Sequence, residues 1–129
     1  MDWLLIWAAF GALAHVYFAF QETVGWGPEF VKKAAKAWIN PHEDPATTNA
    51  HIAWAKPLAA NMGAYNLLLA FGLAWTARQA WVDAPTASPF GVLLGLFLLG
   101  AAAAAGATKV YPALVAQGVL GALLLVASL

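Results

Sequence analysis

Two ionisable residues interrupt the first apolar stretch of the sequence. His15 and Glu22 lie in "GALAHVYFAFQE", residues 11–22. Imidazole and carboxylate groups both serve as general acids and bases. Their spacing of seven returns them to one face of a helix, two turns or about 10 Å apart along its axis. Direct contact between them is not expected, but both can line one groove.

A second polar group lies in "AANMGAYN". Asn61 and Tyr65 are one helical turn apart on the same face, and Asn66 lies about 100° away from Tyr65. His51 and Trp54 continue the face of Asn61 and Tyr65 toward the N-terminal end of this stretch. Gly63 stands between the two asparagines.

These polar residues predict a pocket when they are taken together. A single intramembrane amide usually contributes about 0.6 kcal/mol of helix packing. Taken alone, His15 is also explained by a hydrogen bond to a neighbouring helix, and Glu22 by solvation among lipid headgroups. Gln117 adds an amide in the last apolar stretch, so the six side chains come from three helices. That is more than packing requires, and it favours a polar pocket inside the bundle.

The composition indicates that the surrounding medium is lipid. The chain is 63% hydrophobic and 9% charged, whereas soluble domains carry roughly 25% charged residues. A charge at the bilayer centre costs at least about 2.5–3.5 kcal/mol, so such groups face the protein interior. The net charge of zero gives no basic face for nucleic acid. Since there are no cysteines, thiolate metal sites and cysteine nucleophiles are excluded.

Four apolar stretches approach the length of about 20 residues that a membrane-spanning helix needs. The first stretch has no basic residue before it, because Asp2 stands there, so we expect it to be a retained span and not a signal peptide. The sequence predicts one domain, residues 1–129, that forms an all-α, integral membrane four-helix bundle. The predicted spans are residues 3–20, 57–75, 90–107 and 112–129.

The long first connection has structure of its own. Residues 28–39 place lysines opposite an apolar side and predict a short amphipathic helix in the headgroup region. Two prolines in "NPHEDP" end it. Thr47, Thr48 or Asn49 would then cap a helix that continues into the second span, with Pro57 kinking it or beginning it afresh.

The distribution of basic residues predicts the orientation, because cytoplasmic connections are rich in lysine and arginine. The first and third connections hold five lysines, whereas the termini and the second connection, on the other side of the membrane, hold only Arg78. We therefore expect a multi-pass protein of the cytoplasmic (inner) membrane with both termini extracytoplasmic. The lysines of the first and third connections are Lys32, Lys33, Lys36, Lys56 and Lys109.

Small residues follow one another along the third span. Gly91 and Gly95 have GxxxG spacing, and Gly100 and Ala104 extend the series. Small residues let helix backbones approach closely. The ridge predicts one of two contacts. It either packs against a second copy or a larger membrane complex, or it packs against another helix of the same chain, and both alternatives remain open.

The segments "AHVYFAFQE" and "LAANMGAYNLLLAFGLAW", with a glutamine early in the last span, resemble a bacterial family of small four-span membrane proteins. It is domain-of-unknown-function family thirteen-hundred-and-four, whose members are sometimes labelled epimerases. Met62 departs from its pattern, which usually has glutamine there, and the first connection is longer than expected. The resemblance implies these functional positions: His15, Glu22, Asn61, Gly63, Tyr65, Asn66 and Gln117.

The first functional hypothesis is a pocket that binds a lipophilic small molecule, with isomerase or epimerase chemistry as its catalytic form. His15 or Glu22 would transfer the proton, and Tyr65 and the amides would orient a substrate oxygen. This chemistry needs no nucleophile, redox group or phosphate cradle. Beyond the polar residues above, His51 and Trp54 would contribute to binding.

The alternative is a non-catalytic accessory or pigment-associated subunit of a larger membrane complex. His15 would then ligate haem or a chlorophyll-type pigment; otherwise no cofactor is predicted. Transport is a third hypothesis, and it would require an oligomer. His42, Glu43 and Asp44 offer ligands to a hard cation, but an exposed acidic turn is the commoner explanation, so no metal site is predicted.

Overall fold

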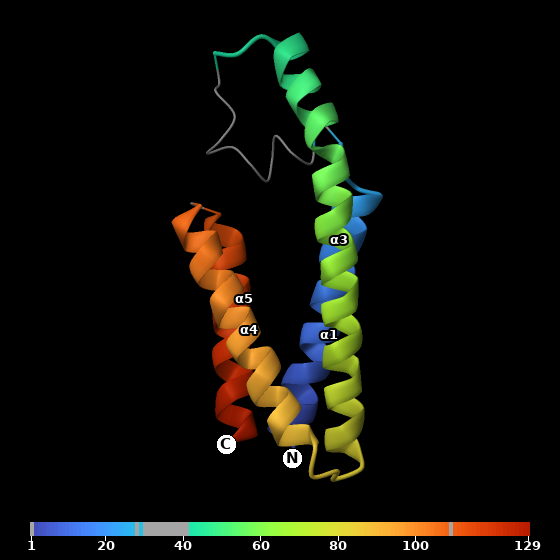
Figure 1. Ribbon diagram of the computed structural model, residues 1–129, viewed down its shortest axis with the longest axis vertical. Coiled ribbons are helices and arrows are strands. Elements are labelled where there is room, and N and C mark those ends of the chain that lie inside the picture. The colour runs from blue at the N-terminus through green and yellow to red at the C-terminus, as the bar shows by residue number, and fades with distance from the viewer. Residues whose placement is uncertain (1, 28, 30–41, 109) are drawn as a thin grey trace. The chain divides into compact units, whose positions relative to one another are not determined.

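The computed structural model describes residues 2–27, 29, 42–108 and 110–129 (Figure 1). This part of the chain forms helices and contains no strand, which confirms the all-α prediction. The predicted amphipathic helix of residues 28–39 lies outside the described residues, apart from Glu29. The helices are α1 (Trp3–Thr23), α3 (Pro45–Trp81), α4 (Ala87–Ala107) and α5 (Tyr111–Ser128).

Each of these four helices is long and apolar enough to cross a membrane. At 1.5 Å per residue, the 21 residues of α1 reach about 31 Å and the 18 residues of α5 about 27 Å. The hydrocarbon core of a bilayer is about 30 Å thick. The protein is therefore a multi-pass membrane protein.

The helix α3 is much longer than the predicted span of residues 57–75. It has 37 residues and contains Pro57 in its interior. The helix neither ends nor restarts at this proline, although proline donates no backbone N–H there. Residues 45–56, which are too polar to be recognised by hydropathy, therefore belong to the same helix as the span.

The N-cap of α3 is Asp44. Its Oδ1 accepts the backbone N–H groups of Ala46 and Thr47, each at 3.0 Å. The prediction that Thr47, Thr48 or Asn49 caps this helix is therefore wrong. The Asp44 carboxylate, three residues before Thr47, already satisfies two of the N–H groups that a helix start leaves free.

The chain divides into two compact units. One, here called the terminal unit, comprises residues 1–15 and 69–129. The other, here called the central unit, comprises residues 16–68. The helices α1 and α3 each contribute to both units, while α4 and α5 belong to the terminal unit alone.

The four-helix bundle is formed in the terminal unit, where parts of all four helices share an apolar core. Both chain termini and the turn between α3 and α4 lie at the same end of this unit (Figure 1). The helices meet mostly through leucine and alanine, which allows short distances between their axes. The core residues are Leu4, Ala8, Ala12, Leu73, Ala77, Ala80, Ala87, Leu98, Leu120 and Leu124.

Two glycines bring the backbones of α4 and α5 together. A Cβ atom built on Gly95 would lie 3.0 Å from the carbonyl oxygen of Gly121, and one on Gly121 would lie 2.9 Å from that of Gly95. Gly91 is likewise covered, by Ser128 and Leu4. Packing within the chain, one of the two predicted readings of the glycine ridge, therefore accounts for Gly91 and Gly95.

The other half of the predicted ridge lies on another side of α4. Nothing lies within 4 Å of a Cβ built on Gly100, and Ala104 is exposed. Five residues separate Gly95 from Gly100, which turns the helix by about 140°. The four small residues therefore form two surfaces and not one.

Candidate functional site

A polar contact joins α1 and α3 in the central unit. The side-chain amide of Asn66 donates through Nδ2 to Oε2 of Glu22, at 2.6 Å. Both side chains are half-buried. A hydrogen bond from an amide to an ionised carboxylate is about twice as strong as one between neutral groups. The contact therefore holds the Glu22 carboxyl group in one position.

Gly63 makes this contact possible. It is buried against α1, where a Cβ would lie 2.5 Å from Cγ2 of Thr23, 3.1 Å from the carbonyl oxygen of Ala19 and 3.4 Å from Cβ of Glu22. Asn66 is three residues further along α3, almost one turn, and so lies on the same side of the helix. The absence of a side chain at Gly63 thus sets the distance across which Asn66 reaches Glu22.

Trp26 ties the segment after α1 to α3. Its indole Nε1 donates to the backbone carbonyl oxygen of Ile52 at 3.2 Å. Ile52 and Ala59 are buried and lie on the side of α3 that also carries Gly63. Two contacts therefore connect α3 to α1 and the segment after it. Trp26 makes one near the start of α3, and Glu22 makes the other further along this helix.

The predicted binding residue His51 lies near the start of α3. Its Nδ1 is 3.4 Å from Oε1 of Glu43, and its side chain is largely exposed. The other carboxyl oxygen of Glu43 accepts the hydroxyl of Thr48 at 2.9 Å. The side chain of Glu43 in the acidic turn before α3 thus contacts residues of the first turns of this helix. The described residues contain no group of three or more metal-binding side chains.

Asn61 and Tyr65 lie on the side of α3 away from Gly63. Each is two positions from this glycine, or about 200° around the helix. Asn61 is exposed, as are Tyr65 at 64% and Trp54 at 77%. The structure thus brings Glu22, Gly63 and Asn66 together and leaves Asn61, Tyr65 and Trp54 on a different face.

His15 and Gln117 belong to the terminal unit. His15 is only 1% exposed, and its Nδ1 lies 2.8 Å from the carbonyl oxygen of Gly11. Because a carbonyl oxygen only accepts, Nδ1 carries the proton and donates. Gln117 is half-buried in α5. A single pocket that joins these two residues to Glu22 and Asn66 stays a prediction.

The sequence did not single out Thr23 and Trp26, although both contribute to the α1–α3 contact. Thr23 directly follows Glu22, and its hydroxyl donates to the carbonyl oxygen of Ala19 at 2.7 Å. Trp26 stands between two glycines. Trp26 could have been recognised from its position, because it lies in a short irregular segment directly after the span. An indole N–H there must find a hydrogen-bond acceptor nearby.

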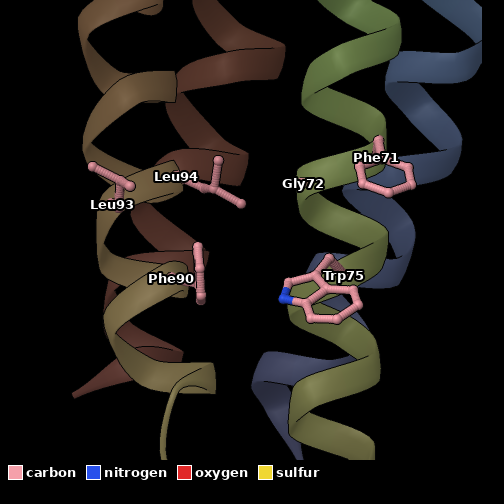
Figure 2. A pocket seen from close by; sticks show the side chains of 6 residues that line it. All are labelled: Phe71, Gly72, Trp75, Phe90, Leu93 and Leu94. Carbon is pink, nitrogen blue, oxygen red and sulfur yellow. The ribbon is translucent and has the colours of Figure 1, made fainter.

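The terminal unit has an apolar groove between α3 and α4. Its volume is about 420 Å³. Figure 2 shows Phe90 and Leu94 on the side of α4 that faces α3, and the indole nitrogen of Trp75 on the side of α3 that faces α4. Such a lining suits hydrocarbon and offers almost nothing to a polar substrate. The lining residues are Phe71, Gly72, Trp75, Phe90, Leu93 and Leu94.

A family model matches a stretch of the chain that includes residues of both units. The model of the DUF1304 family, described as proteins of unknown function, matches residues 9–129. The chain belongs to the DUF1304 family. No curated protein and no solved structure matches the chain. The DUF1304 match includes the Glu22–Asn66 contact, but it brings no activity with it and lends no support to the epimerase label.

Proposed function

We propose that this DUF1304 protein binds a lipophilic small molecule in the membrane and recognises its polar group through Glu22 and Asn66. The observation that carries the proposal is the half-buried carboxylate–amide pair. Glu22 is the second-last residue of α1, a depth at which an amphiphile presents its polar group. An ionised carboxylate only accepts hydrogen bonds, so the ligand carries a hydroxyl or N–H group.

The free energy of the contact favours binding over a purely structural role. Hydrogen bonds between membrane helices contribute about 0.6 kcal/mol on average. A carboxylate costs at least about 2.5–3.5 kcal/mol at the centre of a span, and less toward its ends. Two amides would join α1 and α3 without that cost. A charge at this position is therefore better explained by a ligand than by helix packing.

Co-purification tests this proposal. The wild-type protein, Glu22→Gln and Asn66→Ala are purified in mild detergent, and bound small molecules are measured by native mass spectrometry and solvent extraction. We expect at least tenfold less bound molecule in both variants. Asn61→Ala is the matched control, since it removes the same side chain from the other face of α3. Equal retention by all four proteins would contradict the proposal.

Isomerisation is the catalytic form of this proposal. Glu22 would remove a proton from a carbon of the ligand and release it to water, and a proton from water would be added to the opposite face of that carbon. In deuterated water the extracted ligand should gain one deuterium with the wild-type protein and none with Glu22→Gln. Tyr65→Phe should keep the exchange, because Tyr65 lies away from Gly63. No deuterium in the wild-type ligand would leave binding without catalysis.

Association with other subunits is the second candidate, and exposed small residues on α4 favour it. Gly100 and Ala104 are one turn apart, with open space around Gly100. We propose that they form a contact with a second copy or a larger complex. Gly100→Leu should then lower the oligomer mass in native mass spectrometry. An unchanged mass would place this surface against lipid.

The proposal also includes the orientation in the cytoplasmic membrane. The lysine distribution supports extracytoplasmic termini, and the shared end of both termini and the α3–α4 turn in the terminal unit agrees with an even number of spans. A reporter that is active only in the periplasm, fused after Leu129, should be active. Activity of a cytoplasmic reporter at the same position would reverse the orientation.

A further inference from the structure

The groove between α3 and α4 opens to the side of the terminal unit (Figure 2). Phe71, at 72% exposure, and Leu93, at 61%, stand at its rim. At its floor, a Cβ built on Gly72 would meet Leu94 at 3.6 Å, an ordinary contact distance. Gly72 therefore contributes space to the groove and is not a point where two backbones touch.

A cation lies next to one end of this groove. Cζ of Arg78 is 5.6 Å from the centre of the Trp75 ring, and Trp75 also lines the groove. Arg78 is in the last turn of α3, one turn beyond Trp75. The ion pair found among the described residues joins His51 and Glu43, so no carboxylate of this part of the chain neutralises Arg78.

An apolar groove with a cation at its end matches the chemistry of a phospholipid. The groove lies between two membrane-spanning helices, where the surrounding medium is hydrocarbon. Arg78 follows the predicted span of residues 57–75 by three residues, which places it at headgroup depth. Arginine binds phosphate through paired, directional N–H donors, and its stacking on Trp75 fixes where that phosphate would lie.

We propose that this groove holds one acyl chain of an anionic phospholipid whose phosphate is bound by Arg78. The rim aromatics Phe71 and Trp75 cover the chain, and the space above Gly72 receives it. The positive charge of Arg78 selects lipids with a net negative headgroup over zwitterionic ones. This lipid site is separate from the Glu22–Asn66 pair and does not depend on the ligand proposed there.

Native mass spectrometry of the delipidated full-length protein tests the proposal. Phosphatidylglycerol and phosphatidylcholine with identical acyl chains are added in turn, and the bound fraction is compared. We expect about fivefold more phosphatidylglycerol than phosphatidylcholine on the wild-type protein. Arg78→Gln should remove this preference, and Arg78→Lys should retain part of it. A preference that survives in Arg78→Gln overturns the role of the arginine.

The groove itself is tested by filling it. Gly72→Leu should reduce the retention of both lipids severalfold. Ala74→Leu is the matched control, because it adds a leucine to the same helix at an exposed position, and it should bind as the wild type does. Equal lipid retention by the Gly72→Leu variant, or a groove filled by a second copy in a lipid-free dimer, overturns the proposal.

A fluorescence measurement covers the case in which Gly72→Leu does not fold. Phosphatidylglycerol with brominated acyl chains should quench Trp75 at one lipid per protein, measured as the difference between the wild type and Trp75→Phe. The absence of Trp75 quenching overturns the proposal. Glu22→Gln should leave both readouts unchanged, so this test is independent of ligand binding at Glu22.

Discussion

The two units of the molecule hold their helices together by different means. In the terminal unit the polar side chains of α3 and α5 mostly bond to their own helices: Thr76 donates to Gly72, and Ser128 to Leu124. In the central unit Asn66 and Trp26 reach from one segment to another. The terminal unit therefore depends on close packing, and the central unit combines packing with polar contacts.

This difference follows from the physics of association in lipid. Lipid tails are as apolar as leucine, so helices gain no hydrophobic free energy by meeting, and they need close contact or hydrogen bonds. The Gly95–Gly121 crossing supplies the first in the terminal unit. Close packing is sufficient in the terminal unit, so packing alone does not require a charge such as that of Glu22 in the central unit, and the proposed ligand is our explanation for it.

The largest effect is expected at the crossing of α4 and α5. In the Gly95→Leu variant the new side chain would meet Leu125 and the Gly121 carbonyl oxygen, a backbone group that cannot rotate away. We expect a loss of about 3 kcal/mol of unfolding free energy, measured by thermal unfolding in detergent. In the monomer, Gly100→Leu adds the same side chain to open space on the same helix and should cost almost nothing. Equal stability of the two variants would show that the terminal unit does not depend on this crossing.

A smaller effect is expected where α3 approaches α1. Gly63→Ala places a methyl group against Thr23 and the Ala19 carbonyl oxygen, and we expect a loss of about 1–2 kcal/mol. Thr23→Ser removes the methyl group that lies nearest, so the double variant should recover part of the loss. Gly72→Ala is the control in the terminal unit, where its Cβ makes an ordinary contact. If Gly63→Ala is as stable as Gly72→Ala, the α1–α3 approach is looser than described.

The polar contact should contribute less than either glycine. Removal of the amide in Asn66→Ala is expected to cost about 0.6–1.7 kcal/mol, the range measured for hydrogen bonds between membrane helices. The readout is unfolding in detergent. Asn61→Ala should cost less, because Asn61 is exposed on the other side of α3. An equal cost would mean that the Glu22–Asn66 bond does not stabilise the central unit.

The smallest effect is expected at the start of α3. The Thr47 hydroxyl and then the backbone N–H groups of Thr47 and Ala46 donate to Asp44 and lower its pKa. A lowered folded-state pKa means that this stabilisation is present above the ordinary carboxyl pKa and is lost as the pH falls through the folded-state value. The protection of the first turn of α3 against hydrogen exchange, taken relative to the intrinsic exchange rate at each pH, should therefore fall in acid. Asp44→Asn keeps a capping oxygen and should remove the pH dependence.

The sequence was sufficient for the four spans, because apolar length alone marks a membrane helix. It placed the start of α3 three to five residues too late, because it assigned the cap to Thr47, Thr48 or Asn49 and not to Asp44. Glu22 and Asn66 were predicted as site residues from their polarity. Their direct contact was not predictable, because it depends on how closely Gly63 lets two distant segments approach.

The length of α3 has a consequence for the bilayer itself. Its charges Lys56 and Arg78 are twenty-two positions apart, or about 33 Å along the axis, close to the thickness of the hydrocarbon core. A much thicker membrane would pull one of these charges into hydrocarbon, while the 18 residues of α5 would be too short to cross it. Hydrophobic mismatch should thus favour membranes of ordinary or lesser thickness for this protein.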